Sequence, residues 1–146
     1  MARSQLGDLA ECRECISLAV RTASRRLTQL YDRALGEAGL RSTQFNLLVM
    51  VHEMHQPNIN ALARMLGSDP TTVTRNVQGL IKRRLLAASA GKDLRERKVA
   101  VTRRGEAMLW KALPHWRKVQ ARVNAGLGGR ELKRFRHLLR RVGETT

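Results

Sequence analysis

Apolar residues recur every three to four positions over most of the chain, a spacing that predicts amphipathic α-helices. It predicts helices over residues 9–36, 43–54, 60–66, 70–84, 103–124 and 131–142. After residue 84 the period changes to two, which indicates short strands over 85–90 and 97–101 joined by a turn at 91–93. The expected fold class is therefore mostly α with a small β-hairpin.

The stretch from Asp69 to Arg84 has two chemically different faces. Apolar residues at helical spacing line one side: Val73, Val77, Leu80 and Ile81. Hydroxyl, amide and cationic side chains occupy the other side: Thr71, Thr72, Arg75, Asn76, Gln78 and Lys82. Ser68 or Asp69 can cap the first amides, and Pro70 suits the first helical position. The outer face has the chemistry that meets phosphates and base edges, so this stretch is interpreted as a DNA-recognition helix.

The elements on either side of this helix support that interpretation. A short helix over 60–66 precedes it, and Gly67 and Ser68 form the turn, as in a helix-turn-helix. The hairpin that follows would be a wing, and its tip over 92–98 carries four cations. Arginine at such a tip suits insertion into a narrow minor groove.

Composition adds a strong preference for a polyanionic partner. The 146 residues are enough for one domain, and the formal net charge is +16 with a pI near 11.6. Residues 64–104, which contain the predicted recognition helix, carry eleven cations against three acidic residues. No apolar run approaches a membrane-spanning length and no signal-peptide core is present, so we expect a soluble cytoplasmic protein without a membrane partner.

The apolar stripe of the first predicted helix must be buried by something outside the domain. Residues 9–36 form a proline-free apolar and basic stretch too long to bury its apolar stripe against a small domain. We expect a partner chain to bury this stripe.

Two other predicted helices have candidate caps. Ser42 is expected to cap the helix over 43–54, and Thr102 to cap the helix over 103–124. Pro114 should bend that second helix.

Five segments in order resemble the MarR family of winged-helix transcriptional regulators. They are Leu40–Phe45, Ile59–Gly67, Asp69–Asn76, Asp93–Arg97 and Val101–Gly105. Each segment alone is common, but the five at these spacings are specific. The sequence departs from the family at Pro70, where a basic or polar residue is more usual, and in its Cys12-x-x-Cys15 pair.

The resemblance implies a single domain over 1–146, with a winged helix-turn-helix DNA-binding lobe at about 40–102. Residues 1–39 and 103–146 would be N- and C-terminal dimerisation helices. It also implies a homodimer on a pseudo-palindromic double-stranded operator, and a small, often phenolic or anionic, ligand between the lobes. Arg95 would take the wing-tip role, oriented by Asp93. The DNA-binding candidates from the resemblance and the helix face together are Thr71, Thr72, Thr74, Arg75, Asn76, Gln78, Lys82, Asp93, Arg95 and Arg97.

Several other residues keep more than one interpretation. Arg75 suits guanine and Asn76 suits adenine, although either side chain could instead meet a phosphate, as could Arg97. Cys12 and Cys15 would share a face of the first helix, either as small buried residues or as a redox-active pair. The residues assigned to a ligand pocket are Tyr31, Phe45, His52 and Trp110.

The expected function is a sequence-specific DNA-binding regulator, a repressor released by a small molecule or by oxidation. The alternatives are a constitutive architectural DNA-binding protein without an effector and a metal-responsive regulator that uses the cysteines and histidines. A metal pair at His52 and His55 lacks completing ligands, so no metal site is assigned. No phosphate loop, nucleophile elbow or paired carboxylates occur, so neither an enzyme nor a cofactor is expected.

Overall fold

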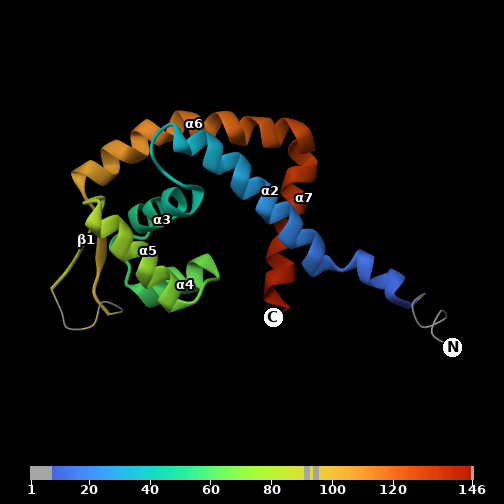
Figure 1. The fold of residues 1–146 in the computed structure, drawn as a ribbon, viewed down its shortest axis with the longest axis horizontal. Helices are drawn as coiled ribbons and strands as arrows, with labels where there is room; N and C mark the ends of the chain where they lie inside the picture. Colours follow the sequence, from blue (N-terminus) through green and yellow to red (C-terminus); the bar gives the residue numbers. More distant parts are fainter. Residues whose placement is uncertain (1–7, 91–92, 94–95, 146) are drawn as a thin grey trace.

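The computed structural model describes residues 8–90, 93 and 96–145. A 3₁₀-helix, η1 (Asp8–Glu14), leads into α2 (Ile16–Gly36), and α3 (Ser42–Glu53), α4 (Ile59–Leu66) and α5 (Pro70–Lys82) follow. Strands β1 (Leu86–Ala88) and β2 (Val99–Val101) precede the long helix α6 (Arg103–Leu127) and the last helix, α7 (Gly129–Glu144). In Figure 1, α3, α4, α5 and the strands form one body, from which α2 and α6 extend toward α7.

The core of the winged body is aliphatic. Its fully buried side chains come from every element between α3 and β2, and include Leu47, Leu48, Ile59, Leu62, Val77, Leu80 and Val99. Leu35 at the end of α2 and Ala112 in α6 join the same cluster. The arms are therefore attached to the body at these two points by shared burial of apolar surface.

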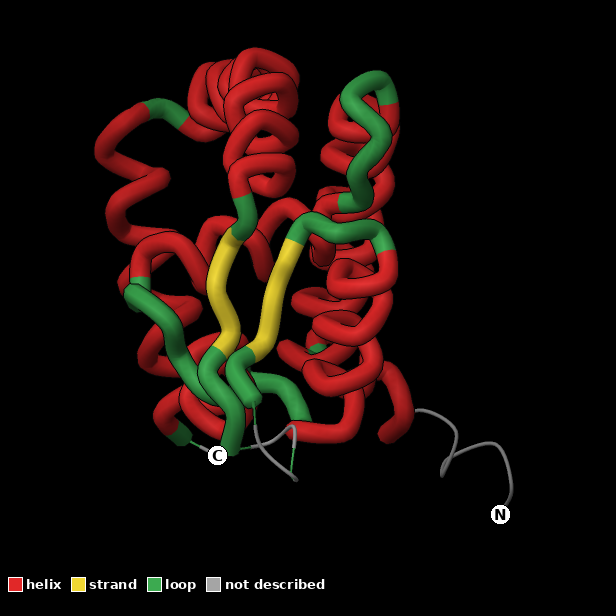
Figure 2. Tube along the Cα trace, turned by 90° about the vertical axis from the view of Figure 1, so that its left-hand side faces the viewer, coloured by secondary structure: helices red, strands yellow, loops and turns green. Residues whose placement is uncertain are grey.

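The hairpin is short and is attached to the body at its base. The strands pair antiparallel in the register Leu86↔Val101, Ala87↔Ala100 and Ala88↔Val99, and Figure 2 shows them side by side. The N–H of Val99 donates to the carbonyl of Pro57 at 2.9 Å. The predicted hairpin is confirmed, although both strands are shorter than the predicted 85–90 and 97–101.

The prediction of one continuous helix over 9–36 is wrong. Cys15 has φ −59° and ψ 118°, which lies outside the helical region and separates η1 from α2. Cys12 and Cys15 therefore do not share a face of one α-helix. They are joined instead by a turn in which the Cys15 N–H donates to the Cys12 carbonyl at 3.3 Å.

The predicted cap of α3 is also wrong. Ser42 is the first residue of the helix, and Arg41 occupies the N-cap position. The Ser42 N–H and hydroxyl both donate to Oδ1 of Asp32, at 2.7 and 2.6 Å. An aspartate from the preceding helix thus takes the place of the local serine cap, a long-range contact that local spacing does not reveal.

The long helix α6 begins and bends as predicted. Thr102 is its N-cap and accepts a hydrogen bond from the Gly105 N–H at 3.0 Å. The helix continues through Pro114, and Figure 1 shows it changing direction near its middle. None of the described helices is long and apolar enough to cross a membrane.

Candidate nucleic-acid interface

Helix α5, the predicted recognition helix, begins with a side-chain cap. The Thr72 N–H donates to Oδ1 of Asp69 at 2.8 Å, and Pro70 follows at the first helical position. The pKa of the Asp69 carboxyl is lowered, first by a hydrogen bond from the Thr72 side chain and then by the Thr72 backbone amide. Of the two predicted caps, Asp69 is the one the structure uses.

The two faces of α5 are separated as the sequence predicts. Val73, Val77 and Leu80 are buried, and Ile81 is half-buried against them. Thr74 is half-buried and its hydroxyl donates to the Pro70 carbonyl at 2.7 Å, so its donor is satisfied within the helix. The exposed residues among the predicted contacts are Thr71, Thr72, Arg75, Asn76, Gln78 and Lys82.

The turn between α4 and α5 fixes their crossing. Gly67 has φ +58°, a left-handed conformation that favours glycine, and the Ser68 N–H returns to the Ala63 carbonyl at 3.0 Å. Asn58 caps the start of α4 by accepting from the Ala61 N–H at 2.9 Å. Both ends of α4 are therefore fixed, and α5 leaves the turn in a defined direction, as in a helix-turn-helix.

The wing lies beside the exposed face of α5. Arg97 is half-buried, and its Nε–H donates to the Ser89 carbonyl, while the Lys98 N–H donates to the Ser89 hydroxyl at 3.0 Å. A groove of about 530 Å³ separates the hairpin from α5, and its walls include Gln78, Arg84 and Arg97. Asp93 is exposed. Arg95 lies outside the described residues, so its predicted role stays a prediction.

Among the described residues, neither Arg75 nor Lys82 forms an ion pair with a carboxylate. His115 Nδ1 lies 3.2 Å from Glu37 Oε2, a contact that joins α6 to the end of α2. Arg75 and Lys82 are therefore available to an external anion. Exposed guanidinium, ammonium, amide and hydroxyl groups on one helix face can contact both phosphates and base edges.

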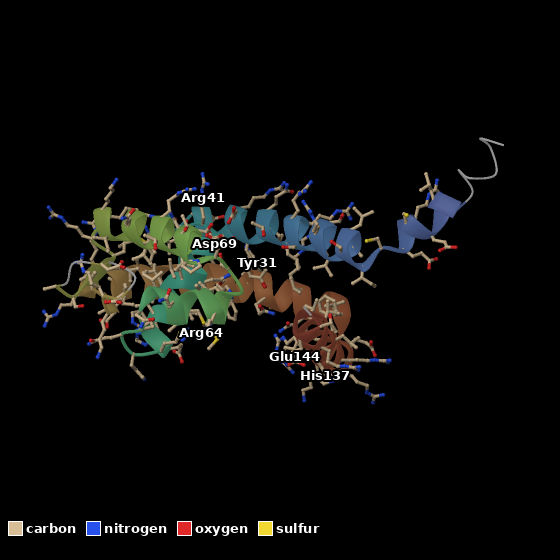
Figure 3. The ribbon with its side chains drawn as sticks, turned by 90° about the horizontal axis from the view of Figure 1, so that it is seen from below. Tyr31, Arg41, Arg64, Asp69, His137 and Glu144 are labelled. Atoms are coloured by element: carbon tan, nitrogen blue, oxygen red, sulfur yellow. The ribbon has the colours of Figure 1, made fainter. Side chains whose placement is uncertain are left out.

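A second candidate site lies between the arms. A cavity of about 800 Å³ is bounded by α2, α6 and α7 and by the start of α3. Its apolar walls include Leu27, Trp116 and Leu138, and its polar groups include Ser42 and Gln120. Figure 3 shows Tyr31, which also lines the cavity, between Asp69 at the start of α5 and His137 on α7.

Tyr31 supplies a polar group on the wall of this cavity. Its hydroxyl donates to Gln120 Oε1 at 2.8 Å, and Gln120 Nε2 donates to Asn124 Oδ1 at the same distance. Burial raises the pKa of the Tyr31 phenol, and the positive charge of Arg136 opposes this rise. The phenol is therefore neutral at physiological pH and held by a fixed acceptor.

The four residues predicted for a ligand pocket do not share one cavity. Tyr31 lines it, whereas Phe45 is buried behind it and stacks on Trp116 with ring centroids 6.3 Å apart. His52 is exposed on α3, and Trp110 is 71% exposed on α6. Trp116 lines the cavity and Trp110 does not, because the two lie on different sides of one helix, and periodicity alone does not show which side faces α2.

The cysteines and histidines gather no metal-binding cluster. Cys12 and Cys15 are both free and exposed. In the part of the chain that the structure describes, no group of three or more histidine, cysteine, aspartate or glutamate residues is placed to hold a metal ion. The metal-responsive alternative therefore has no ligand cluster within the described part of one chain.

Comparisons with known proteins agree with this geometry. The family model described as the MarR family matches residues 40–96. The DNA-bound structure of the M. tuberculosis transcriptional regulator MosR is 36% identical, with a TM-score of 0.77 over 90% of this chain and 97% of that one. MosR without DNA is 35% identical, with a TM-score of 0.78 over 91% and 98% of the two chains.

A probable transcriptional regulator from Pseudomonas aeruginosa is 30% identical, with a TM-score of 0.75 over 90% of this chain and 98% of that one. No curated protein sequence matches. The likeness to MosR and to the Pseudomonas regulator extends over the helical arms as well as the winged body. The chain belongs to the MarR family, whose members are DNA-binding transcription regulators and not enzymes.

Proposed function

We propose that this protein is a homodimeric repressor that acts in the cytoplasm on a pseudo-palindromic operator. The observation that carries the proposal is the exposed, un-neutralised polar face of α5 beside the wing. The similar MosR chain forms a complex with DNA. Each protomer would place α5 in the major groove and its wing in the adjacent minor groove, with residues 40–102 as the DNA-binding lobe.

Roles within this interface follow from side-chain chemistry. Arg75 would read guanine through two donors, and Asn76 would read adenine. The threonines at the start of α5 and Lys82 would contact phosphates, where hydroxyl and ammonium donors suffice. At the wing, Arg95 would enter the minor groove with Asp93 orienting it. Arg97, which already holds Ser89, would use its remaining donors on a phosphate.

The arms supply the case for a dimer. Large apolar side chains are exposed along α2 and α7, among them Ile16, Leu18, Leu27, Phe135, Leu138, Leu139 and Val142. Apolar surface concentrated on two long helices marks an interface. A second copy offers the same helices, so residues 1–39 and 103–146 would form a self-complementary dimerisation module.

The test is a binding competition at fixed salt. Purified protein is titrated with a labelled duplex from its own promoter against unlabelled promoter DNA or a scrambled duplex of equal length. A specific repressor prefers the promoter by about a thousandfold or more. A ratio near one would identify the constitutive architectural protein instead. Log affinity should fall steeply and linearly with log salt for either, because both neutralise phosphates.

The inner end of the cavity between the arms, lined by Tyr31, Ser42, Trp116 and Gln120, would receive the effector, whereas its outer walls on α2 and α7 would belong to the dimer interface. Its apolar walls and its Tyr31, Ser42 and Gln120 polar groups fit a small aromatic ring with a hydroxyl or anionic substituent. Salicylate is a suitable first probe. Binding should quench the Trp116 fluorescence of a Trp110→Phe variant and release the promoter duplex. The matched Trp116→Phe variant should show no quenching, because Trp110 is outside the cavity.

Oxidation is the second candidate signal because Cys12 and Cys15 are free, exposed and joined by a turn. The Cα atoms at the ends of such a turn lie within about 7 Å, close enough for a disulfide. A hydroperoxide would convert one thiol to a sulfenic acid with loss of an alcohol or water. The second thiol would then displace water to form the disulfide. Hydrogen peroxide should release promoter DNA from the wild type and not from Cys12→Ser or Cys15→Ser.

A further inference from the structure

The side chain of Arg83 folds back at the C-terminal end of the recognition helix. Its Nη2–H donates to the Gly39 carbonyl at 2.8 Å, and its Nη1–H donates to Gln44 Oε1 at 3.2 Å. Arg83 is half-buried, and within the described residues it forms no ion pair, so a full positive charge is held by two neutral acceptors. The planar guanidinium fork therefore fixes the end of α5 against the turn between α2 and α3.

The turn that receives Arg83 is itself constrained. Gly39 has φ +83°, and this left-handed conformation turns the chain from α2 toward α3. Gln44 Oε1 also accepts from the Arg41 N–H at 3.1 Å, the hydrogen bond that starts α3. One amide oxygen thus holds both the start of α3 and the end of α5. A displacement of this turn would change both acceptors of Arg83 together.

The same segment reaches the cavity between the arms. Ser42, 8% exposed, lines the cavity and donates twice to Asp32, one residue after the cavity residue Tyr31. Residues 39–44 therefore contact the cavity wall on one side and Arg83 on the other. Five hydrogen bonds of 2.6 to 3.2 Å hold this segment to Asp32 on one side and to Arg83 on the other.

We propose that Arg83 is a positioning residue for DNA recognition. It fixes the orientation of α5 on residues 39–44 and so couples the state of the cavity to the recognition helix. This inference rests on the proposed function. By linkage, an occupant of the cavity that moves Ser42 weakens operator binding, and operator binding weakens that occupant by the same factor.

A direct phosphate contact by Arg83 predicts different behaviour. Each phosphate contact contributes to the dependence of affinity on salt, so loss of one lowers the slope of log affinity against log salt by about one. A positioning residue changes discrimination between sequences and leaves that slope as it was. Gln44→Ala is the sharpest variant, because it removes an acceptor of Arg83 without changing the charge of the protein.

The experiment measures promoter and scrambled duplex affinities at four salt concentrations for the wild type, Gln44→Ala, Arg83→Lys and Thr43→Ala. Gln44→Ala and Arg83→Lys should lower the promoter-to-scrambled ratio by about threefold to thirtyfold, whereas a direct phosphate contact, which both charge-preserving variants retain, would leave that ratio unchanged. Lysine keeps the charge but has no planar fork to span the two acceptors. Thr43→Ala, an exposed neighbour on α3, should match the wild type. Circular dichroism melting establishes that each variant is folded.

The cavity side is tested by Ser42→Ala alone and combined with Gln44→Ala. Ser42→Ala should lower the ratio, and the double variant should lose less than the product of the two single losses, because both act through one segment. Unchanged discrimination in folded Gln44→Ala and Arg83→Lys, with a wild type that prefers its promoter, overturns the inference alone. A wild-type ratio near one overturns the proposed function and this inference with it.

Discussion

Helices α5 and α7 are both amphipathic, but only the apolar face of α5 is buried within the chain. Each carries cations on one face and apolar residues on the other. The apolar face of α5 is buried by its own chain, with Val77 and Leu80 fully covered. No residue of α7 is buried, and Phe135, Leu138 and Leu139 remain 38 to 43% exposed. A two-faced pattern therefore predicts that a face will be covered, but does not identify which chain covers it.

The largest effect is expected from a charge on the apolar face of α7. Leu139→Glu should abolish the proposed dimer and lower promoter affinity by about a hundredfold to ten-thousandfold, because one protomer loses its linked second half-site. Sedimentation equilibrium and duplex titration measure the two effects. Trp110→Glu is the matched control on the outer side of α6 and should remain a dimer. A dimeric Leu139→Glu would mean that another surface joins the protomers.

Truncating one leucine on each helix tests whether its apolar face stabilises the single chain or the association of two chains. Leu80→Ala should cost about 2 to 5 kcal/mol of unfolding free energy, because the side chain is fully buried within one chain. Leu139→Ala should lower stability by an amount that shrinks as the protein is diluted, because the wild type then dissociates as well. Denaturant unfolding at several protein concentrations measures both. If dilution changes neither loss, α7 has no role in association.

Only the cationic face of α5, and not that of α7, should contribute to base preference. Arg75→Ala should cost about 1 to 3 kcal/mol at the promoter and relax preference at one base pair. Arg140→Ala removes the same charge from α7 and should leave base preference unchanged. Titration with single-base variants of the promoter duplex measures this. Equal losses on all sequences for Arg75→Ala would assign that side chain to a phosphate.

The smallest effect is a shift in the titration of Tyr31, on the wall of the cavity between the arms. It is the only tyrosine, so phenolate absorbance reports it alone. Burial raises its pKa, so it should titrate above its ordinary value of about 10. The folded state loses the associated stability as pH rises through that raised value. Arg136→Gln should raise the pKa further, and denaturant should return it to the ordinary value.

The sequence was sufficient for the elements that depend on local spacing. The faces of α5, its cap, the helix-turn-helix and the paired strands all follow from periods of 3.6 and 2 together with turn residues. Long-range contacts were not accessible in the same way. Ser42 has the chemistry of a local cap, yet it bonds to Asp32 on another helix. The break at Cys15 has no glycine or proline to mark it.

The two candidate sites differ in the same way, because one depends on local spacing and the other on long-range contacts. The proposed DNA contacts on α5 lie on one helix face, so local spacing was enough to select them, whereas the cavity is assembled from α2, α3, α6 and α7. Periodicity does not say which face of α6 meets α2, so it does not show that Trp116 rather than Trp110 lines the cavity. Arg83 was counted only as one cation in a basic segment. Its role depends on Gly39 and Gln44, which are 44 and 39 positions away in the chain.

The close approach at Gly105 has a mechanical consequence. A Cβ at that position would collide with the Leu85 carbonyl oxygen, and the Thr102 hydroxyl donates to the Arg84 carbonyl at 2.7 Å. The first turn of α6 is thus fixed to the base of the wing. From there the 25 residues of α6 extend about 37 Å. A rotation of about 5° at the fixed end displaces the far end by about 3 Å. α6 is therefore a lever arm, through which small changes of angle at the winged body become changes of position at α7.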